Sequence, residues 1–192
     1  MDRARAAMRE SILQAVEDLI RDRGWQAVRM ADVAELAGVS RQTLYQLYGS
    51  RDALAQAYVL RETEQFLGSV VDAVRSRADD PVAAFEAGLD TFLTGAADSV
   101  MVKAILRGHA SDDLLPLVTT QGLPVIQTAE QALTEVIAEL WPQIRAEDAR
   151  LFAGSIVRLA ISHITAPTST PETTVKDILR LLTPFVAQAL NP

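Results

Sequence analysis

The sequence of 192 residues contains no cysteine and only two histidines. Without cysteine, disulfide bonds, thiolate catalysis and cysteine-ligated zinc are excluded. The two histidines, His109 and His163, fall on different predicted helices. A zinc site needs three or four ligands that converge on the metal, and two separate histidines with scattered carboxylates do not indicate such a set. We therefore expect neither a metal nor another cofactor.

Three further patterns are missing. No apolar run approaches the length that crosses a bilayer, and the first five residues lack the apolar stretch of a secretory signal. No nucleophile with a base and an orienting group is recognisable, and such a set is what an enzyme of that kind would need. We expect a cytoplasmic protein that makes no membrane contact and is not an enzyme.

Negative charge is unevenly distributed along the chain. The net charge is −7, yet residues 1–60 contain eight arginines and eight acidic residues, so the whole excess lies in residues 61–192. Every basic residue in the first part is arginine, whose guanidinium suits bidentate contacts with phosphate and guanine. Overall acidity therefore neither indicates nor excludes a local nucleic-acid-binding surface.

Helical periodicity dominates the chain, and no segment sustains the period-two alternation of a strand. A first helix is predicted to stop at Gly24. The other predicted helices cover about 30–37, 41–48, 51–77, 81–97, 99–108, 124–140, 146–165 and 171–190. The residues suited to cap them at their N-termini are Ser40, Ser50, Asp80, Ser99 and Thr170. We predict an all-α fold of about nine helices.

Residues 33–48 have the spacing of two short helices packed across a tight turn. Ala34 and Ala37 are small where the helices meet, Gly38 supplies a left-handed conformation, and Ser40 can cap the second helix. A helix-turn-helix has this arrangement because its second helix presents a polar face to the major groove. The residues predicted to form that face are Arg41, Gln42, Thr43, Tyr45 and Gln46.

The run from Gly24 to Leu54 resembles the N-terminal signature of TetR-type transcription regulators. The matching residues are Asp32-Val33-Ala34, Ala37-Gly38-Val39-Ser40, Thr43-Leu44-Tyr45, Tyr48, and Arg51 with Leu54. Three residues depart from the usual pattern. Arg29 stands in place of a capping threonine, Gln46 in place of a frequent histidine, and Arg51 in place of a frequent lysine.

This resemblance implies a three-helix, helix-turn-helix domain over residues 1–50 that binds double-stranded DNA. Tyr48 and Arg51 join the polar face as expected DNA-binding residues, with Tyr45 and Arg51 on phosphates. It also implies a helical domain for ligand binding and dimerisation over residues 51–192. Helices 146–165 and 171–190 carry enough apolar surface to pack on both their own subunit and a partner. Two-fold symmetry of the implied homodimer then requires an operator with inverted half-sites.

Residues 41–45, 55–62, 114–122 and 157–163 resemble one TetR subgroup in particular. That subgroup sits beside alkane-hydroxylase genes and has fatty-acid-like ligands. The resemblance implies a repressor that a small hydrophobic ligand releases from its operator. The residues expected to hold this ligand are Phe66, Phe85, Phe92, Met101, Ile105, His109 and Ile126.

Plainer interpretations stand beside these. The aromatic residues Phe66, Phe85 and Phe92 could equally be ordinary core residues that line no cavity. Residues 60–192 alone fit a helical lipid-binding or adaptor module without DNA binding, although such a module leaves the polar face of residues 33–48 unexplained. For Arg3 and Arg5, the sequence favours a frayed, charged helix end over an arm that enters the minor groove.

Overall fold

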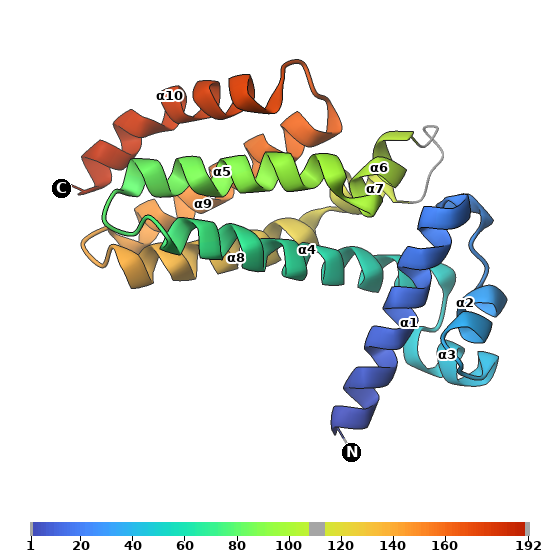
Figure 1. Ribbon diagram of the computed structural model, residues 1–192. Coiled ribbons are helices and arrows are strands. Elements are labelled where there is room, and N and C mark those ends of the chain that lie inside the picture. The colour runs from blue at the N-terminus through green and yellow to red at the C-terminus, as the bar shows by residue number, and fades with distance from the viewer. Residues whose placement is uncertain (1, 108–113, 191–192) are drawn as a thin grey trace. The chain divides into compact units, whose positions relative to one another are not determined.

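The computed structural model describes residues 2–107 and 114–190, and over these residues every regular element is a helix (Figure 1). The all-α prediction is therefore confirmed. The helices are α1 (Asp2–Arg23), the short 3-10 helix η1 (Trp25–Ala27), α2 (Met30–Leu36), α3 (Arg41–Tyr48), α4 (Arg51–Arg75), α5 (Pro81–Asp98), α6 (Val100–Arg107), α7 (Leu115–Val118), α8 (Leu123–Leu140), α9 (Ala146–Thr165) and α10 (Pro171–Leu190). Within the described ranges, no helix is both long enough and apolar enough to cross a membrane.

The chain forms two compact units, and each is described by itself. Unit 1 comprises Met1–Glu62 and Ser99–Gln121, and unit 2 comprises Thr63–Asp98 and Gly122–Pro192. The first boundary between them along the chain therefore falls inside α4, between Glu62 and Thr63. The reason is that the first turns of α4 bond to α1 and to η1, as the contacts of Arg51 and Arg61 below show.

The predicted N-caps are confirmed, because each side chain accepts a hydrogen bond from a backbone N–H in the first turn of its helix. The pairs are Ser40 with Thr43, Ser50 with Ala53, Asp80 with Val82 and Ala83, Ser99 with Val102, and Thr170 with Thr173. Arg29, at the N-cap of α2, makes no such bond. Its departure from the usual threonine therefore leaves this helix start without a side-chain cap.

The turn between α2 and α3 is a Schellman motif. The N–H of Val39 donates to the carbonyl of Ala34 at 2.9 Å, and the N–H of Gly38 donates to that of Glu35 at 3.2 Å. Gly38 has φ +67°, a conformation that side-chain-bearing residues rarely adopt. This turn allows α3 to begin at Arg41, a few residues after α2 ends, and Leu44 of α3 is fully buried.

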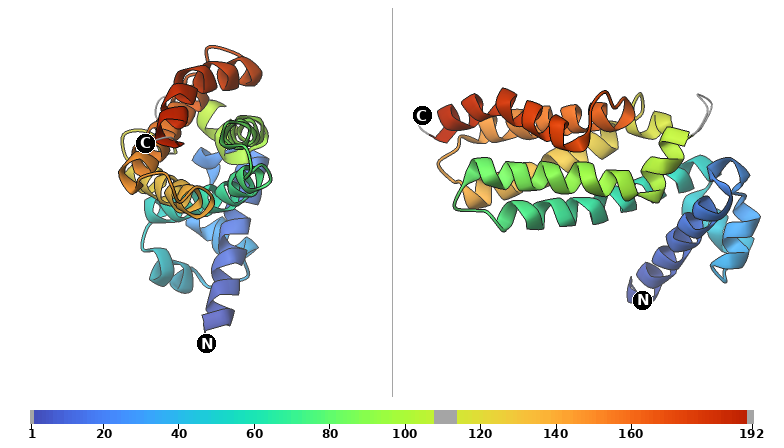
Figure 2. Two further views of the ribbon diagram at one scale, coloured as in Figure 1. Left: turned by 90° about the vertical axis from the view of Figure 1, so that its left-hand side faces the viewer. Right: turned by 45° about the horizontal axis from the view of Figure 1, so that its top comes forward.

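Unit 2 is a layered bundle in which α8 packs on α9 and α5 packs on α10 (Figures 1 and 2). Aromatic rings join these helices in the interior: Phe85 lies 4.4 Å from Phe152 and 5.2 Å from Trp141, measured between ring centroids. The Trp141 indole N–H donates to the carbonyl of Ala78 at 3.0 Å, which satisfies the one polar group of that ring.

Candidate nucleic-acid interface

Leu44 is fully buried and fixes the inner face of α3 on the core of unit 1. The opposite face of α3 is therefore exposed, and its side chains are mostly polar. Four side chains of α3 are exposed, and their spacing places them together on one side of the helix. They are Arg41, Gln42, Tyr45 and Gln46. Tyr45 is 51% exposed, which is unusual for so large an aromatic ring. These four residues are also four of the five that the sequence predicts for the recognition face.

The fifth predicted residue, Thr43, lies differently. It is half-buried, and its hydroxyl is 2.8 Å from that of Ser40, so it belongs to the cap of α3. Tyr48, the last residue of α3, is also half-buried. Burial raises the pKa of the Tyr48 hydroxyl, and the positive charge of Arg9 opposes this rise. Tyr48 therefore keeps its proton and can act as a hydrogen-bond donor at neutral pH.

Arg51, the first residue of α4, reaches back to the segment between α1 and α2. Its Nε donates to the carbonyl of Val28 at 3.1 Å, and one terminal nitrogen donates to the carbonyl of Trp25 at 2.8 Å. The guanidinium also lies over the Trp25 ring, 4.2 Å from its centroid. Arg51 therefore anchors the start of α4, and the phosphate contact expected from the sequence stays a prediction.

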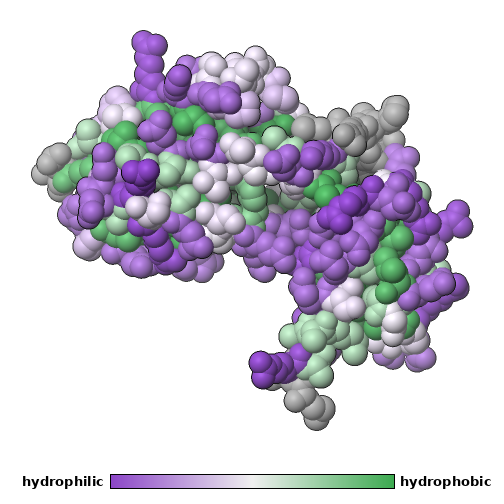
Figure 3. Space-filling view, in the orientation of Figure 1, coloured by the Kyte–Doolittle hydropathy of each residue, from purple (hydrophilic) through white to green (hydrophobic). Residues whose placement is uncertain are grey.

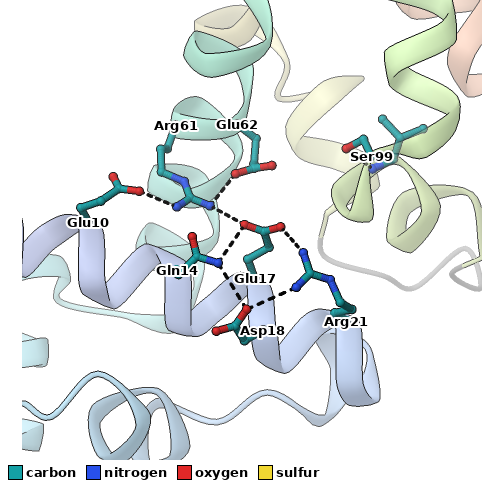
Figure 4. Close-up of polar contacts among 9 residues, drawn as sticks. Glu10, Gln14, Glu17, Asp18, Arg21, Arg61, Glu62 and Ser99 are labelled. Carbon is teal, nitrogen blue, oxygen red and sulfur yellow. Dashed lines mark hydrogen bonds and ion pairs between the residues drawn. The ribbon is translucent and has the colours of Figure 1, made fainter.

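Arg61 forms a second anchor, which we call the Arg61 cluster: Arg61 with Glu10, Glu17 and Glu62 (Figure 4). Only 7% of Arg61 is exposed. Its terminal nitrogens donate to Glu10 at 2.8 Å, to Glu17 at 3.1 Å and to Glu62 at 2.5 Å. The cluster joins α4 to two successive parts of α1, and Glu17 in turn pairs with Arg21.

Burial shifts the pKa values around this cluster. It raises the pKa of Glu62, against the opposing charge of Arg61. The same effect, reinforced by Glu62 and Glu17, raises the pKa of the neighbouring Tyr58 far above the usual range. Removing a buried partner from such a set leaves an uncompensated charge, so the cluster holds α1 and α4 in one arrangement.

The arginines of residues 1–62 fall into two groups. Arg21, Arg23, Arg51 and Arg61 bond to carboxylates or carbonyls of the protein. Five others form no ion pair with any residue that the structure describes, and all are exposed: Arg3, Arg5, Arg9, Arg29 and Arg41. Carboxylates thus neutralise only some of the arginines, and unpaired positive charge is left on α1 and at the starts of α2 and α3. Sequence reasoning missed this pattern because ion pairing depends on the fold.

The residues predicted to bind a ligand are distributed over both units and one segment outside the described residues, and their gathering into one site stays a prediction. Phe66 and Phe92 lie side by side, 5.1 Å apart between ring centroids, and Gly95 makes room for them, since a Cβ there would come within 2.5 Å of the Phe66 ring. Ile126 packs with Leu67, Ala129 and Val157. Met101 and Ile105 belong to α6 in unit 1, and His109 lies outside the described residues.

Phe85 belongs to the core of unit 2, against which Phe92 also packs. Phe85 lines a small depression with Ile137, Ile144, Asp148, Ala149, Phe152, Phe185, Val186 and Ala189. The enclosed space there is only about 10 Å³, enough for about one water molecule. Pockets that bury drug-sized ligands hold roughly 300–1,000 Å³. A long-chain ligand would therefore need side chains at this site to move.

Two family models match the sequence. Residues 12–58 match the family described as bacterial regulatory proteins of the tetR family, and residues 80–184 match the C-terminal domain of the bacterial tetracyclin repressor. The first match covers α2 and α3 with the helices beside them. The second spans more than half of the chain.

Named relatives extend this likeness over nearly the full length. The chain is 36% identical to the HTH-type transcriptional regulator AlkX of Mycobacterium tuberculosis over 95% of its own length and 86% of the relative's. It is 28% identical to the transcriptional activator FasR of Mycolicibacterium smegmatis over 80% of its length and 68% of the relative's. The crystal structure of the repressor AlkX from Dietzia sp., implicated in biodegradation of n-alkanes, matches with a TM-score of 0.83 and 35% identity. That match covers 93% of this chain and 97% of the other.

Arg51→Ala should lower the free energy of unfolding, because it removes hydrogen bonds from a charged donor to the carbonyls of Trp25 and Val28. We expect a loss of roughly 1.5–3 kcal/mol in chemical denaturation. Arg51→Lys should recover only part of it, since an ammonium group cannot reproduce the planar fork. Unchanged stability in Arg51→Ala would show that the anchor contributes nothing to the fold.

Proposed function

The chain belongs to the TetR family of bacterial transcription regulators, and from that premise we propose a repressor that binds an inverted-repeat operator as a homodimer and leaves it when an elongated hydrophobic ligand binds. The exposed polar face of α3 carries this proposal. Its guanidinium, amide and phenol groups are those that read base edges and phosphates in the major groove. A helical lipid-binding or adaptor module would have no use for such a face.

Relatives differ in the sign of their regulation, since the Dietzia protein is a repressor and FasR is an activator. We propose repression because the repressor is the more similar to this chain in identity and in coverage. Release follows from linkage: a ligand that weakens operator binding by a given factor must itself bind the operator-bound form more weakly by the same factor.

Gln42→Ala tests the recognition face. An amide that reads a base edge contributes about 1–3 kcal/mol of discrimination at its own base pair. We expect the variant to lose preference at one or two positions of each half-site while it keeps its preferences elsewhere. The measurement is binding to every single-base-pair variant of a duplex that the wild-type protein has selected from a random library.

The matched control is Gln56→Ala, which removes another exposed glutamine of unit 1, on α4 instead of α3. It should leave the base preferences unchanged. Identical preferences in the wild type and Gln42→Ala would mean that Gln42 does not read the operator.

The proposed dimer is supported by apolar side chains on α9 and α10 that their own subunit leaves uncovered. Most of the apolar surface of α9 is buried within unit 2, against α8, α5 and α10. Leu151 on α9 nevertheless stays 60% exposed, and Leu181 on α10 stays 65% exposed. A second copy would remove both leucines from water, with a gain that scales with the apolar area buried.

Replacing both Leu151 and Leu181 with Glu should weaken dimerisation at least about tenfold, since each change would place an unpaired charge in a dry interface. Sedimentation equilibrium would measure the dissociation constant. Leu123→Glu is the control, because Leu123 is also 60% exposed but lies at the start of α8. A wild-type protein that is monomeric at micromolar concentration would rule out the dimer.

The proposed ligand is a fatty acid or acyl derivative. The link of one similar repressor to n-alkane biodegradation favours this class, as do the apolar residues that form the core of unit 2. Phe66 and Phe92 are in contact, and the depression beside Phe85 is small. Binding would therefore separate packed side chains, which is the kind of change that can shift a two-state equilibrium.

A chain-length series of fatty acids, titrated into an operator complex, tests this ligand class. Each added methylene should contribute up to about 0.8 kcal/mol, which is roughly a fourfold fall in the releasing concentration, until the cavity is filled. Fatty alcohols of equal length would show what the carboxylate contributes. Release that is independent of chain length, or absent throughout, would remove the lipid ligand and leave operator binding intact.

A further inference from the structure

The first turns of α1 form a helix end whose side chains the core of unit 1 does not bury, although Glu10 accepts from Arg61 and the Ser11 hydroxyl donates to the carbonyl of Ala37. Residues 3–11 are all exposed, and burial begins at Ile12. Figures 1 and 2 show this end of α1 continuing past α2 and α3. The sequence there is rich in alanine and arginine, which favour helix without any packing. Further along α1, where the helix packs on α2, hydrophilic side chains cover its outer side (Figure 3).

Two arginines of this end continue the buried stripe of the helix. Arg5 lies seven residues before Ile12, and Arg9 lies seven before Val16, and both of these apolar residues are fully buried. Residues seven apart in an α-helix differ by only about 20° in direction. Arg5 and Arg9 therefore stand on the side of α1 that faces the rest of unit 1, but beyond the point where that core ends.

The surroundings leave both guanidinium groups available. Neither arginine forms an ion pair with a described residue, whereas Arg21 at the other end of α1 pairs with Glu17 and Asp18. The charge of Arg9 acts on the hydroxyl of Tyr48, where it opposes the rise in pKa that burial causes. Arg9 thus lies near the end of α3, the helix with the exposed polar face.

We propose that Arg5 and Arg9 form a second DNA contact, which binds phosphates of the duplex beside the major-groove segment that α3 reads. The exposed turns from residue 3 to residue 11 are roughly 13 Å long, and the major groove is about 12 Å wide. A helix end that continues past α3 is thus long enough to reach the backbone at the edge of the groove. Two unpaired guanidinium groups complement phosphate oxygens in charge and geometry.

This contact would serve affinity and register instead of base preference, because phosphates carry no sequence information directly. It rests on the proposed function, since it requires a bound duplex. In the structure these turns are helical, since α1 begins at Asp2, whereas the sequence favours a frayed end for Arg3 and Arg5.

The test compares the salt dependence of binding for the wild type, the double variant Arg5→Ala/Arg9→Ala, and Arg3→Ala. Arg3 is also exposed and unpaired, but two residues before Arg5 it points about 200° away. The probe is a duplex selected by the wild-type protein. Each lost phosphate contact should reduce the slope of log K against log salt by about 0.9. Between about 50 and 200 mM salt, that is a roughly 3.5-fold smaller loss of affinity for each contact.

We expect the double variant to lose close to two such contacts in each subunit, while Arg3→Ala keeps the wild-type slope. Neutral methylphosphonates at the outer positions of the duplex should reduce the wild-type slope and leave that of the double variant unchanged. Circular dichroism and denaturation would check the fold, which alanine at exposed helical positions should preserve.

Equal slopes for the wild type and the double variant would overturn the proposal, and so would an equal reduction in Arg3→Ala, which would reflect net charge alone. In both cases the wild type still binds its duplex, and the proposed function stands. If the wild-type protein selects no duplex at all, the proposed function and this contact fail together.

Discussion

The arrangement of unit 1 depends on two arginines of α4 that bond backward along the chain. Arg61 is buried among three carboxylates, two of them on α1, and Arg51 holds the carbonyls of Trp25 and Val28. Burying a guanidinium is costly unless its donors are matched, so these sites favour one placement of α4 against α1 and η1. That placement also limits where α3 can lie, because short turns connect α3 to α2 on one side and to α4 on the other. The face of α3 that is exposed follows from this.

The helix that carries these anchors also crosses from one unit to the other. Residues 51–62 of α4 belong to unit 1, and its remainder belongs to unit 2. The chain passes between the units at only two further points, after α5 and after α7. A ligand that changes the packing in unit 2 would therefore act on the same continuous helix that carries these two anchors. Phe66, in contact with Phe92 of α5, lies on that same helix.

Arginine serves two purposes in residues 1–62. Some arginines bond to other groups of the protein, and others are exposed without an ion pair to a described residue. Carboxylates or backbone carbonyls bond Arg21, Arg23, Arg51 and Arg61, whereas Arg3, Arg5, Arg9, Arg29 and Arg41 form no ion pair with a described residue. A stretch with zero net charge can in this way present a positive surface, because the potential near a surface depends on local charge more than on the total. An acidic chain is thus compatible with binding a polyanion.

The sequence by itself determined what depends on residues close together along the chain. The helices, their N-caps at Ser40 and Ser50, and the turn at Gly38 all rest on contacts across three to five residues, which a pattern records. Tertiary structure alone decided the rest. The hydrogen-bond partners described above for Arg51 and Arg61 lie between 23 and 51 residues away, apart from the neighbouring Glu62. The grouping of the predicted ligand residues also depends on the fold: hydrophobic residues pack with any apolar neighbour, so their composition does not specify which of them meet.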